Sequence, residues 1–124
     1  MREVASYLLS EDLGWGLVPP TVLRQGPHGL GSVQFYIHAD EAAHFFTIQH
    51  DARYTRELKR VVALDVVINN ADRKAGHCLV GHDGRLWAID NALTFHEEPK
   101  LRTVIWDYAG EPLPADVRAD LNRL

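Results

Sequence analysis

The sequence predicts one α+β domain, mainly helical with short β-hairpins. Three observations point to this fold class. Residues 54–68 carry a strong helical periodicity, and an Asp-Gly pair at 83–84 separates two short apolar runs, as in a β-hairpin. The 124 residues contain no internal repeat, low-complexity tract or linker, which suits a single domain spanning residues 1–124. The expected order is a helix, a small sheet, a long helix, a polar loop, a hairpin and further helices, which is α+β with more helix than strand.

The first part of the chain is expected to form one helix followed by extended structure. Apolar side chains recur on one face of residues 2–13, and Gly14 ends the helix. Pro19 and Pro20 exclude helix from the next segment. An extended segment, a glycine-rich loop and an alternating strand then follow at residues 17–23, 25–31 and 32–38. Asp40 is expected to cap a helix that starts at residues 40–43.

The second part is expected to be built around the helix at residues 54–68. One face of this helix combines apolar side chains with a single carboxylate: Leu58, Val61, Val62, Asp65 and Ile68. Asn69 and Asn70 are expected to cap its end. A polar loop, a hairpin and two helices follow at residues 69–76, 78–90, 100–108 and 113–124, the last opened by Pro114. The core is expected to include Trp15, Trp87 and Trp106.

Composition narrows the functional classes. The net charge is −4, so a nucleic-acid partner is not expected. No apolar run approaches the roughly 20 residues of a membrane span, and the N-terminus has no apolar signal core. The single cysteine, Cys78, forms no intrachain disulfide and is expected to be buried and unreactive, because it opens an apolar run. We therefore expect a cytoplasmic protein without a transmembrane segment.

Polar residues that can carry chemistry concentrate between residues 69 and 90. Asp72 lies in the polar loop after the long helix, and Asp90 ends the second strand of the expected hairpin. Phosphotransferases use such a pair: the loop aspartate orients or deprotonates the acceptor hydroxyl, and the second aspartate binds the metal that bridges the nucleotide phosphates. Hard carboxylate oxygens suit Mg²⁺, which offsets the phosphate charge.

Two motifs carry a family resemblance. Asp72-Arg73, with a ligand position at His77, and the run Ala-Ile-Asp-Asn-Ala-Leu-Thr-Phe at residues 88–95 resemble the catalytic loop and metal-binding motif of type II phosphatidylinositol 4-kinases. They are more similar still to an uncharacterised actinobacterial branch of the phosphatidylinositol 3-/4-kinase-related family, to which residues 14–21 and 98–103 are also similar. The resemblance therefore extends over nearly the whole chain.

The resemblance implies a protein-kinase-like C-terminal lobe that binds ATP with Mg²⁺ or Mn²⁺. Carried over by position, Asp72 would be the catalytic base, and Asp90 and His77 would be metal ligands. Kinases normally place Asn at the position of His77, and imidazole suits softer metals than Mg²⁺. His77 is therefore expected to bind phosphate, to leave a single Mg²⁺, or to favour Mn²⁺.

The same resemblance assigns roles to neighbouring positions. Residues 32–38 would form the strand that contacts adenine, and Asp65 would tie down the catalytic loop. The nucleotide would contact Gln34, Phe35 and Ile89, and its phosphates would face Arg73 and Lys74.

A kinase N-terminal lobe supplies a phosphate-covering loop and a strand lysine, and neither pattern occurs in the sequence. We therefore expect a truncated domain without that lobe, an inactive or severely impaired pseudokinase that binds nucleotide or a partner. The alternative is an active lipid or protein kinase that receives the missing lobe in trans. A homodimer or a protein partner is expected to cover an exposed apolar patch formed by Leu17, Val33, Phe35 and Ile89.

Simpler interpretations stay open at this point. In these interpretations Asp72 lies in an exposed turn, Asp90 caps a helix at residues 91–95, and Arg73 and Lys74 are solvated. A zinc centre would draw on His77, Cys78, His82, Asp90 and His96, although no Cys-x-x-Cys or His-Glu-x-x-His spacing occurs. A Ser/His/Asp or Cys/His hydrolase is a further alternative.

Overall fold

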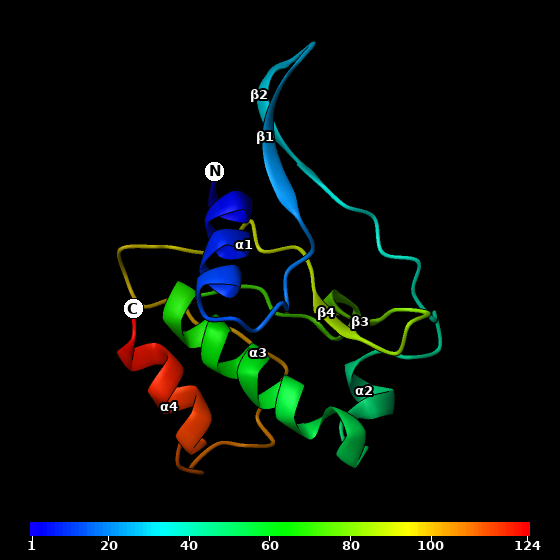
Figure 1. Ribbon diagram of the computed structural model, residues 1–124, viewed down its shortest axis with the longest axis vertical. Coiled ribbons are helices and arrows are strands. Elements are labelled where there is room, and N and C mark those ends of the chain that lie inside the picture. The colour runs from blue at the N-terminus through cyan, green and yellow to red at the C-terminus, as the bar shows by residue number, and fades with distance from the viewer.

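A β-hairpin projects from a body of helices and loops in the computed structural model, which describes residues 1–124 (Figure 1). The chain forms four α-helices and two separate antiparallel sheets of two strands each. In chain order the elements are α1 (Arg2–Asp12), β1 (Thr21–Gly26), β2 (Gly29–Gln34), α2 (Phe45–Ile48), α3 (Thr55–Ile68), β3 (Cys78–Val80), β4 (Leu86–Ala88) and α4 (Ala115–Asn122). This mixture of helix and small antiparallel sheets agrees with the expected secondary-structure class.

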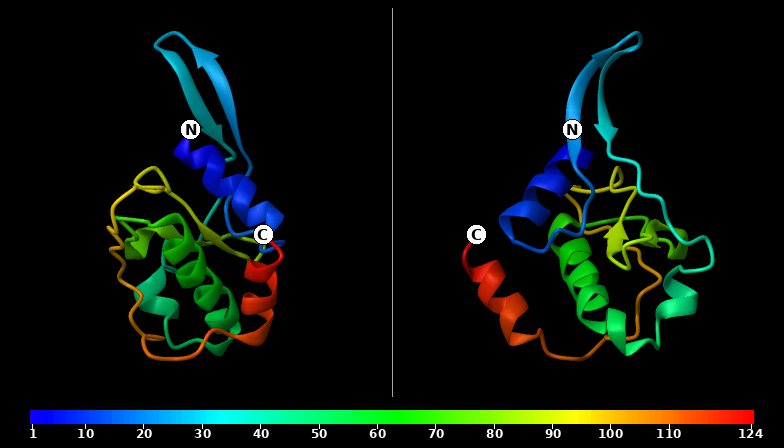
Figure 2. Two further views of the ribbon diagram at one scale, coloured as in Figure 1. Left: turned by 90° about the vertical axis from the view of Figure 1, so that its left-hand side faces the viewer. Right: turned by 45° about the vertical axis from the view of Figure 1, so that its right-hand side comes forward.

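Helix α3 lies at the centre of the body in every view (Figures 1 and 2). Of the predicted face, Leu58, Val61 and Ile68 are fully buried, whereas Val62 is only partly buried. Leu64, which the prediction did not include, is also fully buried. These fully buried side chains pack in one core of 17 residues with side chains from residues 13–18, α2, the β3–β4 hairpin, Ile105 and Val117. The helix ends where Asn69 adopts the left-handed conformation, with a φ of 53°. The expected Asn69 cap is therefore confirmed.

The hairpin of β1 and β2 stands apart from the body (Figure 2) and is called the arm below. Its strands pair from Thr21 opposite Gln34 to Gly26 opposite Gly29, so residues 27 and 28 form the tip. Beyond Thr21 its side chains are almost all exposed. The prediction of a loop at 25–31 is wrong, because both strands continue through its glycines. The strand predicted at 32–38 is also misplaced, because β2 ends at Gln34.

Two further expectations about local structure are wrong. Residues 40–43 form a turn, not a helix, although Asp40 does cap it by accepting a hydrogen bond from the Ala42 amide at 3.0 Å. Residues 100–108 form no helix, because their backbone is committed to the loop after α3: the amides of Arg102 and Val104 donate to the carbonyls of Asn70 and Arg73. Trp106 is consequently 64% exposed and outside the core.

The two terminal helices meet beside α3. Trp15, in the turn after α1, donates its indole N–H to the Asp120 carboxylate of α4 at 2.8 Å. Trp15 and Trp87 are buried, as expected. Helix α4 starts directly after Pro114, a position where the missing proline N–H is tolerated. None of the helices combines the length and the apolar character that a membrane crossing requires.

Candidate nucleotide and metal site

Three side chains expected to take part in metal and phosphate chemistry lie together. One ligand atom from each of Asp72, His77 and Asp90 lies within 4.8 Å of the other two. Asp72 and His77 come from the loop after α3, whereas Asp90 follows β4. The carboxylate of Asp90 is about half exposed and His77 is mostly covered, so the cluster opens to solvent on the Asp90 side. These residues are called the cluster below.

Backbone contacts hold the two loop members of the cluster. The Asp72 amide donates to the side-chain oxygen of the buried Asn70 at 2.9 Å, which starts a turn directly after α3. His77 ends a short 3₁₀ turn, in which its amide donates to the Lys74 carbonyl at 3.1 Å. The His77 Nδ1 lies 3.2 Å from the Asp72 backbone oxygen, and its Nε2 lies 3.0 Å from Asp90 Oδ2.

Asp90 reaches the cluster through an unusual backbone conformation. Its φ is 55°, in the left-handed region that Asp tolerates better than most residues. The preceding amide, that of Ile89, donates to the His77 carbonyl at 2.9 Å, so the two backbone segments are joined next to the cluster. Residues 91–95 form no helix, and the alternative in which Asp90 caps one is therefore wrong.

A buried ion pair between Arg73 and Asp65 anchors the loop that carries Asp72 and His77 to helix α3. The Arg73 guanidinium also donates to the Ile89 carbonyl at 2.7 Å and to the Asn91 side chain at 2.5 Å. Burial alone lowers the pKa of Arg73, but the Asp65 carboxylate outweighs it and the pKa is raised. Asp65 thus ties down the loop as expected. The expectation that Arg73 faces phosphate is wrong, because its side chain is turned into the interior and is 1% exposed.

Lys74 remains on the outer side of the same loop. Its side chain is 65% exposed, and its Nζ lies 3.6 Å from Asp72 Oδ2. A flexible ammonium at this place can swing between the Asp72 carboxylate and a bound anion. The two consecutive basic residues therefore divide into one structural anchor and one group available to ligand.

A cleft of about 450 Å³ adjoins the cluster and brings together the three residues expected to contact nucleotide. Gln34, Phe35 and Ile89 all line it, and the other lining residues are Tyr36, Ile37, Ala39, Asp40, Glu41, Ala43, His44, Gly76 and Leu79. Gly76 and Ile89 directly precede His77 and Asp90, so the cleft lies next to the backbone that carries two cluster residues, although no cluster side chain lines it. The segment after β2 forms one wall, and Phe35 in it is 67% exposed. The expected apolar patch is only partly present, because Leu17 is buried at 2% exposure.

A second, wider cleft of about 740 Å³ lies beside Asp72 and was not foreseen. Its walls combine Asp72 and Leu93 with three groups that can attract anions, His96, Lys100 and Arg102. The His96 Nε2 is buried without a hydrogen-bond partner. Thr103 makes a strand-like contact with Arg73, which brings residues 99–102 beside Asp72. Sequence patterns missed this cleft because that contact joins distant parts of the chain.

Glu3 is another residue near the site that sequence reasoning missed. Burial raises the pKa of its carboxyl, the Asn91 amide lowers it, and the nearby charge of Asp90 raises it. Its Oε2 is buried without a hydrogen-bond partner. An acidic residue in the first turn of a helix normally indicates only a favourable interaction with the helix dipole. The sequence therefore gave no reason to expect Glu3 near Asp90 and Asn91.

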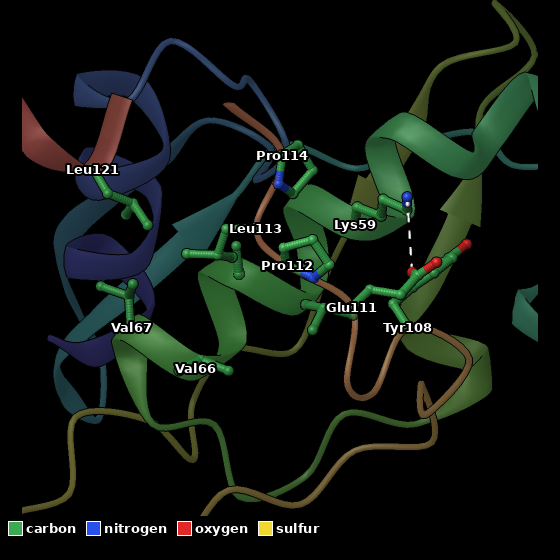
Figure 3. A pocket seen from close by; sticks show the side chains of 11 residues that line it. Lys59, Val66, Val67, Tyr108, Glu111, Pro112, Leu113, Pro114 and Leu121 are labelled. Carbon is green, nitrogen blue, oxygen red and sulfur yellow. Dashed lines mark ion pairs between the residues drawn. The ribbon is translucent and has the colours of Figure 1, made fainter. Parts of the chain in front are cut away.

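A small apolar pocket of about 160 Å³ lies elsewhere, between α3, residues 108–114 and α4 (Figure 3). Val66 and Val67 of α3 face Leu113 and Leu121 there, and the Lys59–Glu111 ion pair lies at its edge (Figure 3). None of its lining residues belongs to the cluster or to the two clefts.

The zinc alternative loses most of its ligands. The cluster contains His77 and Asp90, but Cys78, His82 and His96 are not part of it. Cys78 is fully buried in the core, and burial raises the pKa of its thiol to about 11. The expected burial of Cys78 is therefore confirmed, and its sulfur is not available as a ligand.

Two relatives match most of this chain. Protein Rv2133c of Mycobacterium tuberculosis is 36% identical over 149 residues, covering 90% of this chain and 52% of that protein. Phosphatidylinositol 4-kinase gamma 4 of Oryza sativa subsp. japonica is 30% identical over 146 residues, covering 100% of this chain and 26% of that protein. This chain is similar in part to a phosphatidylinositol kinase. The expected resemblance is thereby supported at that level.

The chain spans about half the length of the first relative and about a quarter of the second. No protein-family model matches it.

Proposed function

We propose that this chain is a phosphatidylinositol-kinase-like module, with the fold of a kinase C-terminal lobe, that binds ATP with Mg²⁺ or Mn²⁺. One observation carries the proposal: the cleft lined by Gln34, Phe35 and Ile89 includes Gly76 and Ile89, the chain neighbours of His77 and Asp90 in the cluster. A largely apolar cleft next to a group of carboxylates suits a nucleotide whose base is buried and whose phosphates are held by a cation. The partial similarity to a phosphatidylinositol kinase supports the same function.

The donor set fits a divalent cation. Two carboxylates and one imidazole offer three ligand atoms within 4.8 Å of one another, and the open side of the cluster leaves room for water and phosphate oxygens. A cation bound by Asp90 and His77 would offset the negative charge of the nucleotide phosphates. The exposed side chain of Lys74, close to Asp72, supports a role in pairing with a phosphate oxygen.

Asp72 is assigned to the acceptor. Asp72 lines the wider cleft, which shares no lining residue with the nucleotide cleft. In that position its carboxylate orients an acceptor hydroxyl and accepts its proton. Lys100 and Arg102, which also line the wider cleft, suit an acceptor that carries negative charge.

Residues 1–124 by themselves are proposed to transfer phosphate poorly. Efficient transfer requires the α- and β-phosphates to be held in line with the acceptor, usually by a glycine-rich loop and a lysine on a strand. The second candidate function is an active ATP-dependent lipid or protein kinase that obtains these parts in trans. The anchored Asp72 loop favours this candidate, because its geometry is already fixed by buried contacts.

Binding is tested by thermal unfolding with ATP and either Mg²⁺ or Mn²⁺. A ligand that binds the folded state raises the melting temperature by mass action. We expect a rise that is lost in Asp90→Asn and reduced in Phe35→Ala, but kept in Asp107→Asn, which changes an exposed carboxylate outside both clefts. No rise at millimolar ATP would refute nucleotide binding.

Transfer is tested separately with labelled γ-phosphate. The poor-transfer proposal expects little label on any acceptor above the buffer control. Robust transfer that disappears in both Asp72→Asn and Asp90→Asn would refute it and establish the second candidate function.

The arm supports a proposal about assembly. Val33 in the arm and Phe35 directly after it are 55% and 67% exposed, and the two-stranded sheet leaves both outer edges unpaired. Such edges readily pair with another strand. We propose that two copies of the chain associate through the arm, and light scattering that shows a monomer at high concentration would contradict this.

A further inference from the structure

We propose that Asp72, His77 and Asp90 form a site that binds first-row transition-metal dications, such as Co²⁺ and Mn²⁺, in preference to Mg²⁺. The inference rests on the proposed function, since it concerns the cation of the same cleft. It follows from three features of the cluster: the spacing of its ligand atoms, the identity of one donor, and the group that faces the other nitrogen of the imidazole.

The spacing suits one ion. First-row dications lie about 2.0–2.2 Å from imidazole nitrogen and carboxylate oxygen, so two ligands of one ion are at most roughly 4.4 Å apart. The three atoms offered by the cluster are within 4.8 Å of one another before any ion is bound. Small rotations of the half-exposed Asp90 carboxylate are sufficient to close the remaining difference.

The donor set decides the kind of ion. Mg²⁺ selects oxygen ligands in near-ideal octahedral geometry and gives up its water reluctantly. Imidazole nitrogen instead suits the later first-row ions, whose affinity for a mixed nitrogen and oxygen site rises from Mn²⁺ through Co²⁺. His77 supplies that nitrogen at the centre of the cluster, where its Nε2 lies 3.0 Å from an Asp90 oxygen.

One contact of the other imidazole nitrogen matches that of metal-bound histidines. A histidine that binds metal through one nitrogen almost always donates the N–H of the other to a carboxylate, water or backbone carbonyl, which fixes its orientation. The His77 Nδ1 lies 3.2 Å from the Asp72 backbone oxygen, which accepts in the tautomer protonated at Nδ1, and 3.4 Å from the Lys74 amide, which donates to Nδ1 in the other tautomer. With the proton on Nδ1, Nε2 offers its lone pair on the side of Asp90.

The ring is also held through its own backbone. The His77 amide donates to the Lys74 carbonyl at 3.1 Å, and the His77 carbonyl accepts from the Ile89 amide at 2.9 Å. The imidazole therefore has little freedom to leave the cluster. A nearby competitor for the carboxylates is the Lys74 ammonium, 3.6 Å from Asp72, and its exposed side chain can move into solvent when an ion binds.

The test compares metal affinities of the full 124-residue chain without an affinity tag and without nucleotide. Co²⁺ binding is followed by its visible absorption, which changes when nitrogen enters the coordination sphere, and Mn²⁺ and Mg²⁺ binding by calorimetry. We expect Co²⁺ to bind at least about tenfold more tightly than Mg²⁺, with Mn²⁺ between them. His77→Asn, which offers an oxygen at the same place, should lose about tenfold or more of the Co²⁺ affinity and keep that for Mg²⁺.

His50→Asn is the matched control, because His50 is exposed and lies outside the cluster. Equal affinities for Co²⁺ and Mg²⁺, or a Co²⁺ affinity that falls equally in His50→Asn and His77→Asn, would overturn the inference. So would a folded His77→Asn variant with an unchanged ratio of Co²⁺ to Mg²⁺ affinity. The outcome is separable from the proposed function. Co²⁺ binding through His77 without any stabilisation by ATP keeps the inference and refutes the function. Stabilisation by ATP without Co²⁺ binding through His77 refutes only the inference.

Discussion

Arg73 and Asp65 form a doubly hydrogen-bonded ion pair in the protein interior, with Nε–Oδ2 and Nη2–Oδ1 distances of 2.9 Å each. Both side chains are essentially excluded from solvent. Removing one partner leaves the other charge buried and unpaired. Arg73→Met should therefore lower the free energy of unfolding by about 3–5 kcal/mol, measured by urea denaturation.

The matched control for that variant is Arg56→Met. Arg56 pairs with Asp116 on the surface, where both side chains are largely exposed. Its loss should change the free energy of unfolding by no more than about 1 kcal/mol. Similar losses in the two variants would mean that the Arg73 pair does not anchor the loop.

Cys78 should make stability depend on alkaline pH. Burial outweighs the nearby Arg73 charge, which lowers the pKa of the thiol, and with a smaller contribution from Asp65 raises that pKa from an ordinary value of 9.0 to about 11. The folded state therefore keeps the proton that the unfolded chain releases, and stability falls as pH rises from about 9 to about 11. The difference in unfolding free energy between the native chain and Cys78→Ala, followed from pH 8 to 11, should decrease across this interval. A constant difference would contradict the burial of the thiol.

Gly16 should not tolerate a side chain. Its φ is 58°, and a Cβ there would collide with the Arg85 Nη2, the atom that donates to the Gly16 carbonyl. Gly16→Ala should destabilise the protein by about 1–2 kcal/mol in thermal or urea unfolding. Gly31→Ala is the control, since its added Cβ meets nothing within 4 Å, and it should be neutral. Equal effects at the two positions would show that the turn at residue 16 is not constrained.

The arm should exchange its amide hydrogens much faster than α3. An isolated two-stranded hairpin is marginally stable in water, whereas α3 is enclosed by the core. Hydrogen exchange followed by NMR should show weak protection from residues 22 to 33 and protection near the global unfolding limit at Val61 and Leu64. Strong protection of the arm in dilute solution, growing with protein concentration, would instead indicate pairing between copies.

Local patterns predicted the elements that local forces determine. Helix α3 and the Asp-Gly hairpin depend on periodicity and turn chemistry within a few residues, and both occur where expected. The glycines at positions 26, 29 and 31 were misread as a loop, because an exposed hairpin needs few packed side chains and tolerates them. Residues 100–108 carry a helical pattern but donate their amides to Asn70 and Arg73, a long-range commitment that no local window contains.

The candidate site was likewise predicted only in part from the sequence. The pair of Asp72 and Asp90 followed from motif spacing, whereas His77 came from the family resemblance. The resemblance also assigned Gln34, Phe35 and Ile89 to the nucleotide, and these three residues line one cleft. The inward direction of Arg73 did not follow, because it depends on the buried carboxylate of Asp65, eight residues earlier in the chain. Adjacent basic residues look alike in sequence, and only packing shows that one is an anchor and the other faces solvent.

The segment after β2 that forms one wall of the nucleotide cleft is held by backbone hydrogen bonds at its two ends but not in its middle. The Phe35 amide is fastened to the Pro20 carbonyl at 2.8 Å, and the His38 carbonyl to the His82 amide at 3.0 Å. Between these points the amides of Tyr36 and Ile37 donate to no backbone carbonyl. The segment is thus held at its two ends, and the amides in its middle have no backbone hydrogen bond. Selectivity among flat ligands would then depend on how far the segment must move to admit the ligand, and on the conformational entropy that it loses when a bound ring fixes it.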